Sequence, residues 1–193
     1  MEWVTTTLLL EQLSDGDEQA WAQLSQRFRT PIVRFVRSLG VPESEAEDVT
    51  QEALLIFLDA YRRGRYAREK GRLSSWLFGL AAQAVKRRGR GARRQARELP
   101  APSVFWQELS EPELRDAWDL EWDRHVFERC LSQVRHELRP DTVAAFELVT
   151  LQELSADEVA ARTGLTTNAV YLAKRRVLQR IQQLREEHEH LAS

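Results

Sequence analysis

The spacing of apolar residues is the strongest constraint on the fold, because they recur three and four positions apart in almost every segment. That period places apolar side chains on one face of a helix, as Trp21, Leu24 and Phe28 illustrate. The alternation typical of half-buried strands is absent. The sequence therefore predicts an all-α fold of two small helical domains joined by an acidic linker, the C-terminal one containing a helix-turn-helix.

Local signals predict where the helices of the N-terminal half begin and end. Either Asp15 or Asp17 can cap a helix that begins near residue 18. Pro31 suits a first turn and disrupts a helix interior, so we expect this helix to restart or kink there. A further helix is expected between Pro42 and Gly64. Its predicted buried face consists of Val49, Ala53, Ile56, Phe57 and Ala60.

Charge is segregated along the chain rather than spread evenly. Residues 62–97 hold thirteen Lys or Arg and one acid, whereas residues 98–123 hold eight acids and one base. Because the net charge is only −2, any binding of nucleic acid has to rest on local patches and not on the overall charge.

The acidic stretch also contains three prolines and interrupts the helical pattern. We expect a linker over residues 98–121, with a short helix allowed after Pro112, between domains at 1–97 and 122–193. Trp118 and Trp122 are expected to pack on the second of these domains.

Composition excludes several classes of function. Cys130 is the single cysteine, so no intrachain disulfide can form, and it is expected to be a core thiol. No apolar run approaches the roughly 20 residues that span a membrane, and the N-terminus does not resemble a signal peptide. His125, Cys130 and His136 are spread around one helix rather than spaced as metal ligands. We expect a cytoplasmic protein that has no catalytic residues, metal or cofactor and is not an enzyme.

Residues 154–181 have the pattern of a helix-turn-helix. Ser155 and Glu158 can form a capping box, Gly164 suits the tight turn, and Thr166 can cap the second helix. The exposed face of that helix would lie in a major groove, although an ordinary helical hairpin has the same pattern. The candidate contacts to bases or phosphates are Thr167, Asn168, Tyr171, Lys174, Arg175, Arg176 and Arg180.

Residues 43–94 combine an acidic helix with a basic, aromatic one. Glu45, Asp48 and Glu52 share a helical face, where like charges repel unless a basic partner neutralises them. Aromatic residues among cations, such as Tyr66 and Trp76, suit unpaired bases, which stack on rings while cations contact the backbone. A solvated acidic face and a buried Trp76 are the alternatives, and burial is the stronger interpretation for Trp76.

These segments, in their order and spacing, resemble the bacterial extracytoplasmic-function sigma factors over nearly the whole chain. EAEDVTQEALLIFL is similar to the segment of that family that docks on the polymerase β′ clamp helices, and KGRLSSWLFGLAAQAVKRRGR to the segments that open and read the −10 element. LSADEVAARTGLTTNAVYLAKRRVLQRI is similar to the family's −35 reader. The resemblance implies a region 2 domain, a linker and a region 4 domain.

The resemblance also implies roles for individual residues. Core polymerase would be bound by Glu45, Asp48, Gln51, Glu52, Leu55, Phe57 and Leu58. The −10 DNA would be bound by Arg65, Tyr66, Arg68, Lys70, Arg72, Ser74, Trp76, Gln83, Lys86, Arg87, Arg88 and Arg90. Ala82-Gln83 departs from the Arg-Asn that the family has there, and Tyr171, Leu172 and Ala173 depart from its basic reading helix, so base preferences do not carry over.

The implied partners are core RNA polymerase, through its β′ clamp helices and β flap, and promoter DNA. An anti-sigma factor is one candidate regulator, and a Ser/Thr kinase acting on Thr50 is another. The competing interpretation is a stand-alone helix-turn-helix regulator whose N-terminal domain dimerises or binds an effector.

Overall fold

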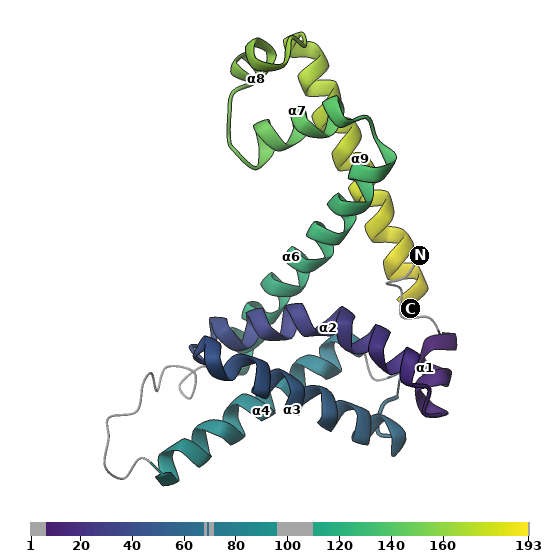
Figure 1. The fold of residues 1–193 in the computed structure, drawn as a ribbon, viewed down its shortest axis with the longest axis vertical. Coiled ribbons are helices and arrows are strands. Elements are labelled where there is room, and N and C mark those ends of the chain that lie inside the picture. Colours follow the sequence, from purple (N-terminus) through teal and green to yellow (C-terminus); the bar gives the residue numbers. More distant parts are fainter. Residues whose placement is uncertain (1–6, 68, 70–71, 96–109, 193) are drawn as a thin grey trace. The chain divides into compact units, whose positions relative to one another are not determined.

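The computed structural model describes residues 7–67, 69, 72–95 and 110–192, and apart from a single 3-10 position its regular structure over these ranges is α-helical (Figure 1). Side chains at 7–8, 89–95 and 187–192 lie outside the description. The all-α prediction is confirmed. Two compact units are present, Met1–Asp123 with the last two residues, and Arg124–Leu191.

The first unit contains four complete helices and the beginning of a fifth. They are α1 (Thr7–Ser14), α2 (Glu18–Ser38), α3 (Glu43–Arg62), α4 (Leu73–Gln95) and the first part of α6 (Glu111–Glu137). The second unit contains the rest of α6, α7 (Pro140–Thr150), α8 (Ala156–Thr163) and α9 (Thr167–Ala192).

Helix α2 begins where one of the two predicted caps lies. The Asp17 carboxylate accepts hydrogen bonds from the backbone N–H groups of Gln19 at 2.7 Å and Ala20 at 3.4 Å. The helix then continues through Pro31, which differs from the expected restart. The apolar neighbours Phe28 and Ile32 are almost completely buried, and this burial offsets the roughly 3 kcal/mol that an internal proline costs.

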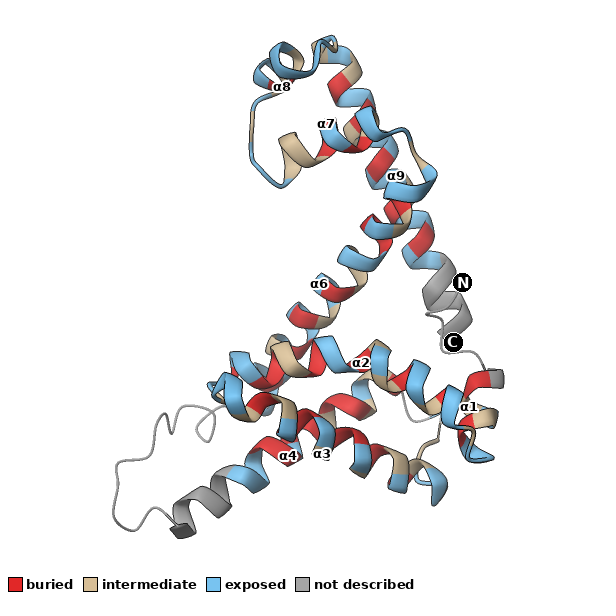
Figure 2. Cartoon of the chain, viewed as in Figure 1, coloured by how far each residue is buried: buried red, intermediate tan, exposed pale blue. Residues whose placement is uncertain are grey.

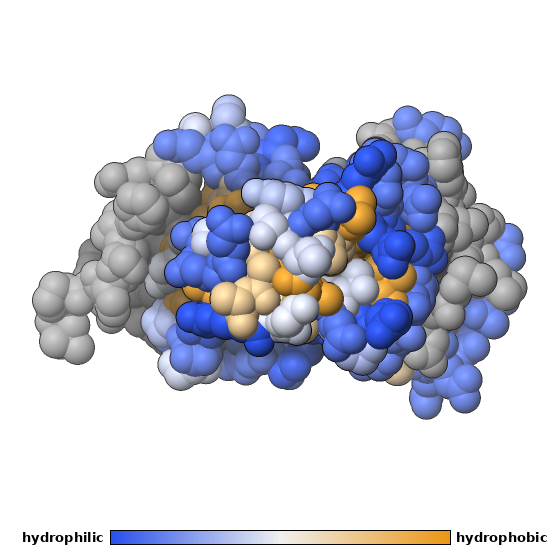
Figure 3. Space-filling model, turned by 90° about the horizontal axis from the view of Figure 1, so that it is seen from above, coloured by the Kyte–Doolittle hydropathy of each residue, from blue (hydrophilic) through white to orange (hydrophobic). Residues whose placement is uncertain are grey.

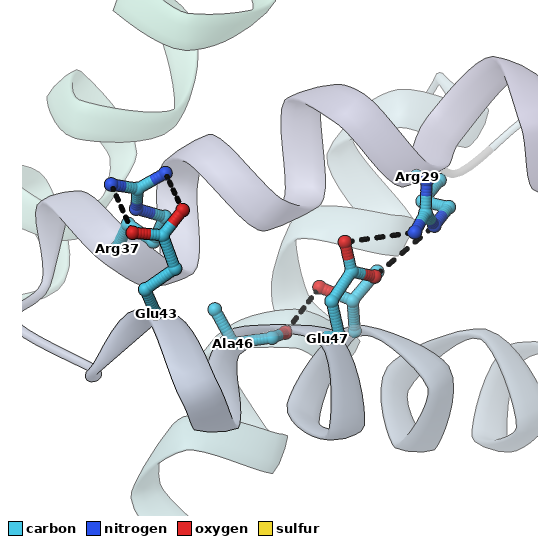
Figure 4. A network of polar contacts seen from close by, with 6 residues as sticks. Arg29, Arg37, Glu43, Ala46 and Glu47 are labelled. Carbon is cyan, nitrogen blue, oxygen red and sulfur yellow. Dashed lines mark hydrogen bonds and ion pairs between the residues drawn. The ribbon is translucent and has the colours of Figure 1, made fainter.

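Helix α3 lies between α2 and α4 in the first core. It packs against both helices, and the buried residues of α3 and α4, coloured red in Figure 2, belong to one hydrophobic core. On the α2 side, Arg29 pairs with Glu47 at 2.9 Å and Arg37 with Glu43 at 3.2 Å (Figure 4). Exposed pairs of this kind contribute at most about 1 kcal/mol each, so apolar burial holds α3 in place.

Helix α6 corrects the predicted linker. It begins directly after Ser110, whose backbone N–H and hydroxyl both donate to Glu113 at 2.7 Å. Residues 111–121 are therefore helical, and residues 98–109 of the expected linker lie outside the described residues. Trp118 and the half-buried Trp122 belong to the core of the first unit and not, as expected, to that of the second.

Five aromatic rings account for this packing. Trp118 contacts Phe35 and Phe78 with ring centroids 5.5 and 6.0 Å apart. Trp122 stacks on Phe28 at 5.4 Å and on Trp118 at 6.0 Å. Because aromatic pairs at these separations add to ordinary apolar burial, they fix the first turns of α6 on α2 and α4.

The predicted helix-turn-helix is formed by α8 and α9. Both hydrogen bonds of the Ser155–Glu158 capping box are present, and Gly164 has a φ of 71°, where a side chain would be strained. The Thr166 hydroxyl accepts from Ala169 N–H at 3.2 Å, which confirms the second cap. Val159 and Val170 join the small core between these helices and α7. Cys130 is a buried thiol, as expected.

Candidate functional site

Three residues of α3 form an exposed stripe that we call the α3 stripe: Asp48, Gln51 and Leu55. They lie three and four positions apart and therefore share a face. Leu55 is 60% exposed, which makes it one of the most exposed large apolar residues in the described chain. A leucine flanked by a carboxylate and an amide can anchor a protein partner while the polar neighbours set the charge of the surface.

Two other apolar residues predicted for the docking surface, Phe57 and Leu58, are less exposed than Leu55. Phe57 is fully buried in the first core, where it contacts Tyr61 and Trp76. It cannot contact a partner, and this corrects the prediction that it lies in the docking surface. Leu58 is half-buried and packs against the same core, so only part of its side chain remains available.

The two remaining acids of the predicted surface are paired with α4. Glu45 accepts a hydrogen bond from Arg88 at 2.8 Å, and Glu52 accepts one from Arg87 at 3.1 Å. We call these contacts the α3–α4 ion pairs. Both arginines were expected to hold DNA and both acids to hold polymerase, so the two predicted surfaces meet. The residues are 43 and 35 positions apart, and no local sequence signal reveals the contact.

Thr50 is not accessible to a modifying enzyme in the folded unit. Its side chain is fully buried, and its hydroxyl donates to the Ala46 carbonyl at 2.8 Å inside α3. A kinase has no access to this hydroxyl in the folded unit. The expectation of control by phosphorylation at Thr50 is therefore contradicted.

The basic, aromatic segment places two half-buried rings side by side. Tyr66 and Trp76 stack with centroids 5.2 Å apart, and Trp76 also meets Phe57 edge-on at 5.3 Å. Trp76 packs against the core, in agreement with the stronger of the two interpretations of this residue. Both residues of the stacked pair are nevertheless partly exposed.

The polar residues predicted for DNA around this pair have mixed exposure. Arg65, Arg72, Gln83, Lys86, Arg87 and Arg88 are exposed and Ser74 is half-buried. Lys86 lies 3.9 Å from Glu111 at the start of α6. Arg68, Lys70 and the side chain of Arg90 lie outside the described residues. Ala82 is buried, so within Ala82-Gln83 only Gln83 can affect recognition at the surface.

Four of the residues predicted for the reading face of α9 are exposed. Asn168, Tyr171, Arg175 and Arg176 are all exposed, opposite the buried Val170 and Ala173. The surface seen from above in Figure 3 is mostly hydrophilic, with apolar residues exposed in several places. This exposure agrees with the sequence-based assignment of the two faces of the helix.

Three other residues predicted for the reading face are less accessible. Thr167 is half-buried, and its hydroxyl donates to Asp157 at 2.9 Å, which joins α8 to α9. Lys174 is half-buried. Arg180 donates to Glu137 of α6 at 2.6 and 3.2 Å. Thr167 and Arg180 therefore have structural partners that the sequence did not predict.

The Arg180–Glu137 contact predicts a pH dependence. Hydrogen bonds from Arg180 and Gln133 hold the pKa of Glu137 below its usual range in the folded unit. A lowered folded-state pKa stabilises the fold above the unfolded pKa, and this contribution is lost as the pH falls through the folded pKa. We expect Glu137→Gln to lower the free energy of unfolding at neutral pH and the difference to shrink below about pH 4.3. Urea denaturation at several pH values measures this, and a difference that is constant with pH would contradict it.

No group of three His, Cys, Asp or Glu among the residues that the structure describes could hold a metal ion. None of the described helices combines the length and the apolar character needed to cross a membrane.

The chain is similar to known proteins over most of its length. The family profile Sigma-70 region 2 matches residues 24–95, which extend from α2 to α4. The ECF RNA polymerase sigma factor SigD of Mycobacterium tuberculosis is 31% identical over 175 residues, covering 86% of this chain and 77% of that protein. ECF RNA polymerase sigma factor RpoE of Cereibacter sphaeroides is 25% identical over 183 residues, covering 94% of each.

Two further similarities cover almost the whole chain. The ECF RNA polymerase sigma-E factor of Escherichia coli is 26% identical over 197 residues, covering 95% of this chain and 97% of that protein. The solved structure of CnrH in complex with the cytosolic domain of CnrY covers 93% of this chain and 96% of that one at 19% identity, with a TM-score of 0.38.

Proposed function

The chain belongs to the extracytoplasmic-function RNA polymerase sigma factors, and on that premise we propose which of its surfaces perform each step of initiation. Members of this family bind core RNA polymerase and direct transcription initiation at specific promoters. They are initiation factors and not enzymes, since the polymerase carries out the chemistry. We further propose that this chain acts in the cytoplasm, where polymerase and DNA are found.

The proposed docking site for the polymerase is the α3 stripe of Asp48, Gln51 and Leu55. The single observation that supports it best is the 60% exposure of Leu55 beside an acid on the same face. A leucine in that setting gives an apolar anchor, and the carboxylate gives complementarity to the basic β′ clamp helices. The second unit is the proposed contact for the β flap.

The proposed −10 site combines the stacked Tyr66–Trp76 pair with the exposed cations around it. A base that stacks on one of these partly exposed rings would gain roughly 1–3 kcal/mol, which helps to offset the cost of unpairing. Lys86, Arg87 and Arg88 are exposed in the C-terminal half of α4 and are suited to the duplex backbone.

The proposed −35 site is the exposed face of α9. Asn168 and Tyr171 lie near the N-terminus of the helix, which in this motif reaches base edges, and Arg175 and Arg176 are placed for phosphates. An anti-sigma factor stays a prediction, and no surface is assigned to it.

One experiment separates this function from the stand-alone regulator. The purified chain is mixed with core polymerase and a library of promoter fragments, and transcripts are sequenced. We expect specific transcripts only when both proteins are present, and weak binding of the chain alone to duplex DNA. Tight, sequence-specific binding without polymerase, together with no stimulated transcription, would favour the regulator.

A further inference from the structure

We propose that Leu172 of α9 contacts the C5 methyl group of a thymine in the upstream promoter element, and so makes this factor selective for thymine at one position. The inference rests on the proposed −35 function of α9. Leu172 is not among the residues assigned to DNA contacts above.

The position of Leu172 supports this role. Its side chain is 55% exposed, although a leucine of an amphipathic helix is usually buried. Asn168 lies one turn before it and Arg175 and Arg176 one turn after it, and all three are exposed. Leu172 is therefore an apolar element within a row of hydrogen-bond donors.

The scaffold holds that row rigidly. Val170 and Ala173, on either side of Leu172 in the sequence, are buried in the small core with Val159. The Thr167 hydroxyl is bonded to Asp157 of α8 at 2.9 Å, which fixes the first turn of α9. An exposed side chain on a well-anchored helix is suited to contacting a groove without rearrangement.

The charge of the face indicates which partner covers it. Between residues 167 and 185 the helix carries five Lys or Arg and no acid. Arg180 is paired with Glu137, but the exposed Arg175 and Arg176 leave the reading face positively charged and complementary to a polyanion. DNA is therefore the favoured occupant over another protein. Within the major groove, thymine alone presents a methyl group, and apolar side chains recognise it by contact.

The experiment uses the holoenzyme assembled from the full chain and core polymerase. A library randomised in the upstream element is first selected for binding. Each thymine of the selected element is then replaced by deoxyuridine, which removes only the methyl group. We expect one replacement to weaken wild-type binding by about fourfold, the effect of one buried methyl group.

Three variants make the test specific to this side chain. Leu172→Ala is expected to bind thymine and deoxyuridine templates equally, and Leu172→Met to retain the discrimination. Leu178→Ala is the matched control, since Leu178 is a 42% exposed leucine of the same helix, and it is expected to behave like the wild type.

Three outcomes would overturn the proposal. If an upstream element is selected but deoxyuridine has no effect at any position, the methyl contact is wrong and the −35 function stands. If Leu172→Ala weakens binding equally on both templates, Leu172 contacts a protein. If no upstream element is selected at all, the proposed −35 function fails as well.

Discussion

Leu55→Lys is expected to weaken the affinity of the chain for core polymerase by about 30-fold or more, because central anchors of an interface contribute about 2 kcal/mol or more. The substitution removes the apolar anchor of the α3 stripe and adds a positive charge facing a basic partner. Leu55 is 60% exposed, so the fold of the first unit should not change. Titration of labelled chain with core polymerase measures the dissociation constant.

The chain offers a closely matched control in Leu120. This residue is 61% exposed, lies in the same unit and is also helical, but it belongs to α6. Leu120→Lys should leave the affinity within about twofold of the wild type, as exposed substitutions away from an interface usually do. Equal losses for the two variants would show that added charge, and not the α3 stripe, determines binding.

Trp118→Ala is expected to lower the free energy of unfolding of the first unit by about 3–5 kcal/mol. Trp118 is only 2% exposed and contacts the rings of Phe35, Phe78 and Trp122. Removing it leaves a cavity at the centre of this aromatic cluster. Urea denaturation followed by near-ultraviolet circular dichroism, which reports aromatic packing, measures the change.

Leu120→Ala provides the control for this substitution as well. It removes an apolar side chain two residues away on α6, but one that is exposed. Its effect should be within about 0.5 kcal/mol. If Trp118→Ala unfolds at the same urea concentration as Leu120→Ala, the beginning of α6 is not part of the first core. A chain that ends at residue 97 lacks α6. Its first unit should therefore lose at least as much free energy of unfolding as Trp118→Ala does.

Features set by neighbouring residues could be predicted from the sequence. The cap at Asp17, the Ser155–Glu158 box and the turn at Gly164 each depend on a few adjacent positions. The start of α6 also depends on adjacent positions, since Ser110 and Glu113 have capping-box spacing. Apolar residues then follow at intervals of four, at Leu114, Trp118 and Trp122. Pro112, which lies in the first turn of α6, and the prolines at 100 and 102 indicated a linker instead.

The docking surface was predicted only in part. Helical periodicity places Phe57 on the buried face of α3, and family resemblance places it in the docking surface; the structure agrees with the periodicity. The α3–α4 ion pairs could not be predicted, because they depend on how two helices pack and not on the sequence of either one.

These ion pairs have a consequence for the salt dependence of DNA binding. A cation that meets a phosphate normally displaces a condensed counterion, and each such contact contributes about −0.9 to the logarithmic salt slope on duplex DNA. Arg87 and Arg88 are already paired with the carboxylates of the α3–α4 ion pairs. When these arginines move to phosphates, the two carboxylates lose their partners and attract cations from solution. Counterion release from the DNA and cation uptake by the carboxylates oppose each other. The logarithmic salt slope for DNA binding by the chain alone should therefore be shallower than the number of its exposed cations predicts. A polymerase that occupies the two carboxylates would restore the steeper slope.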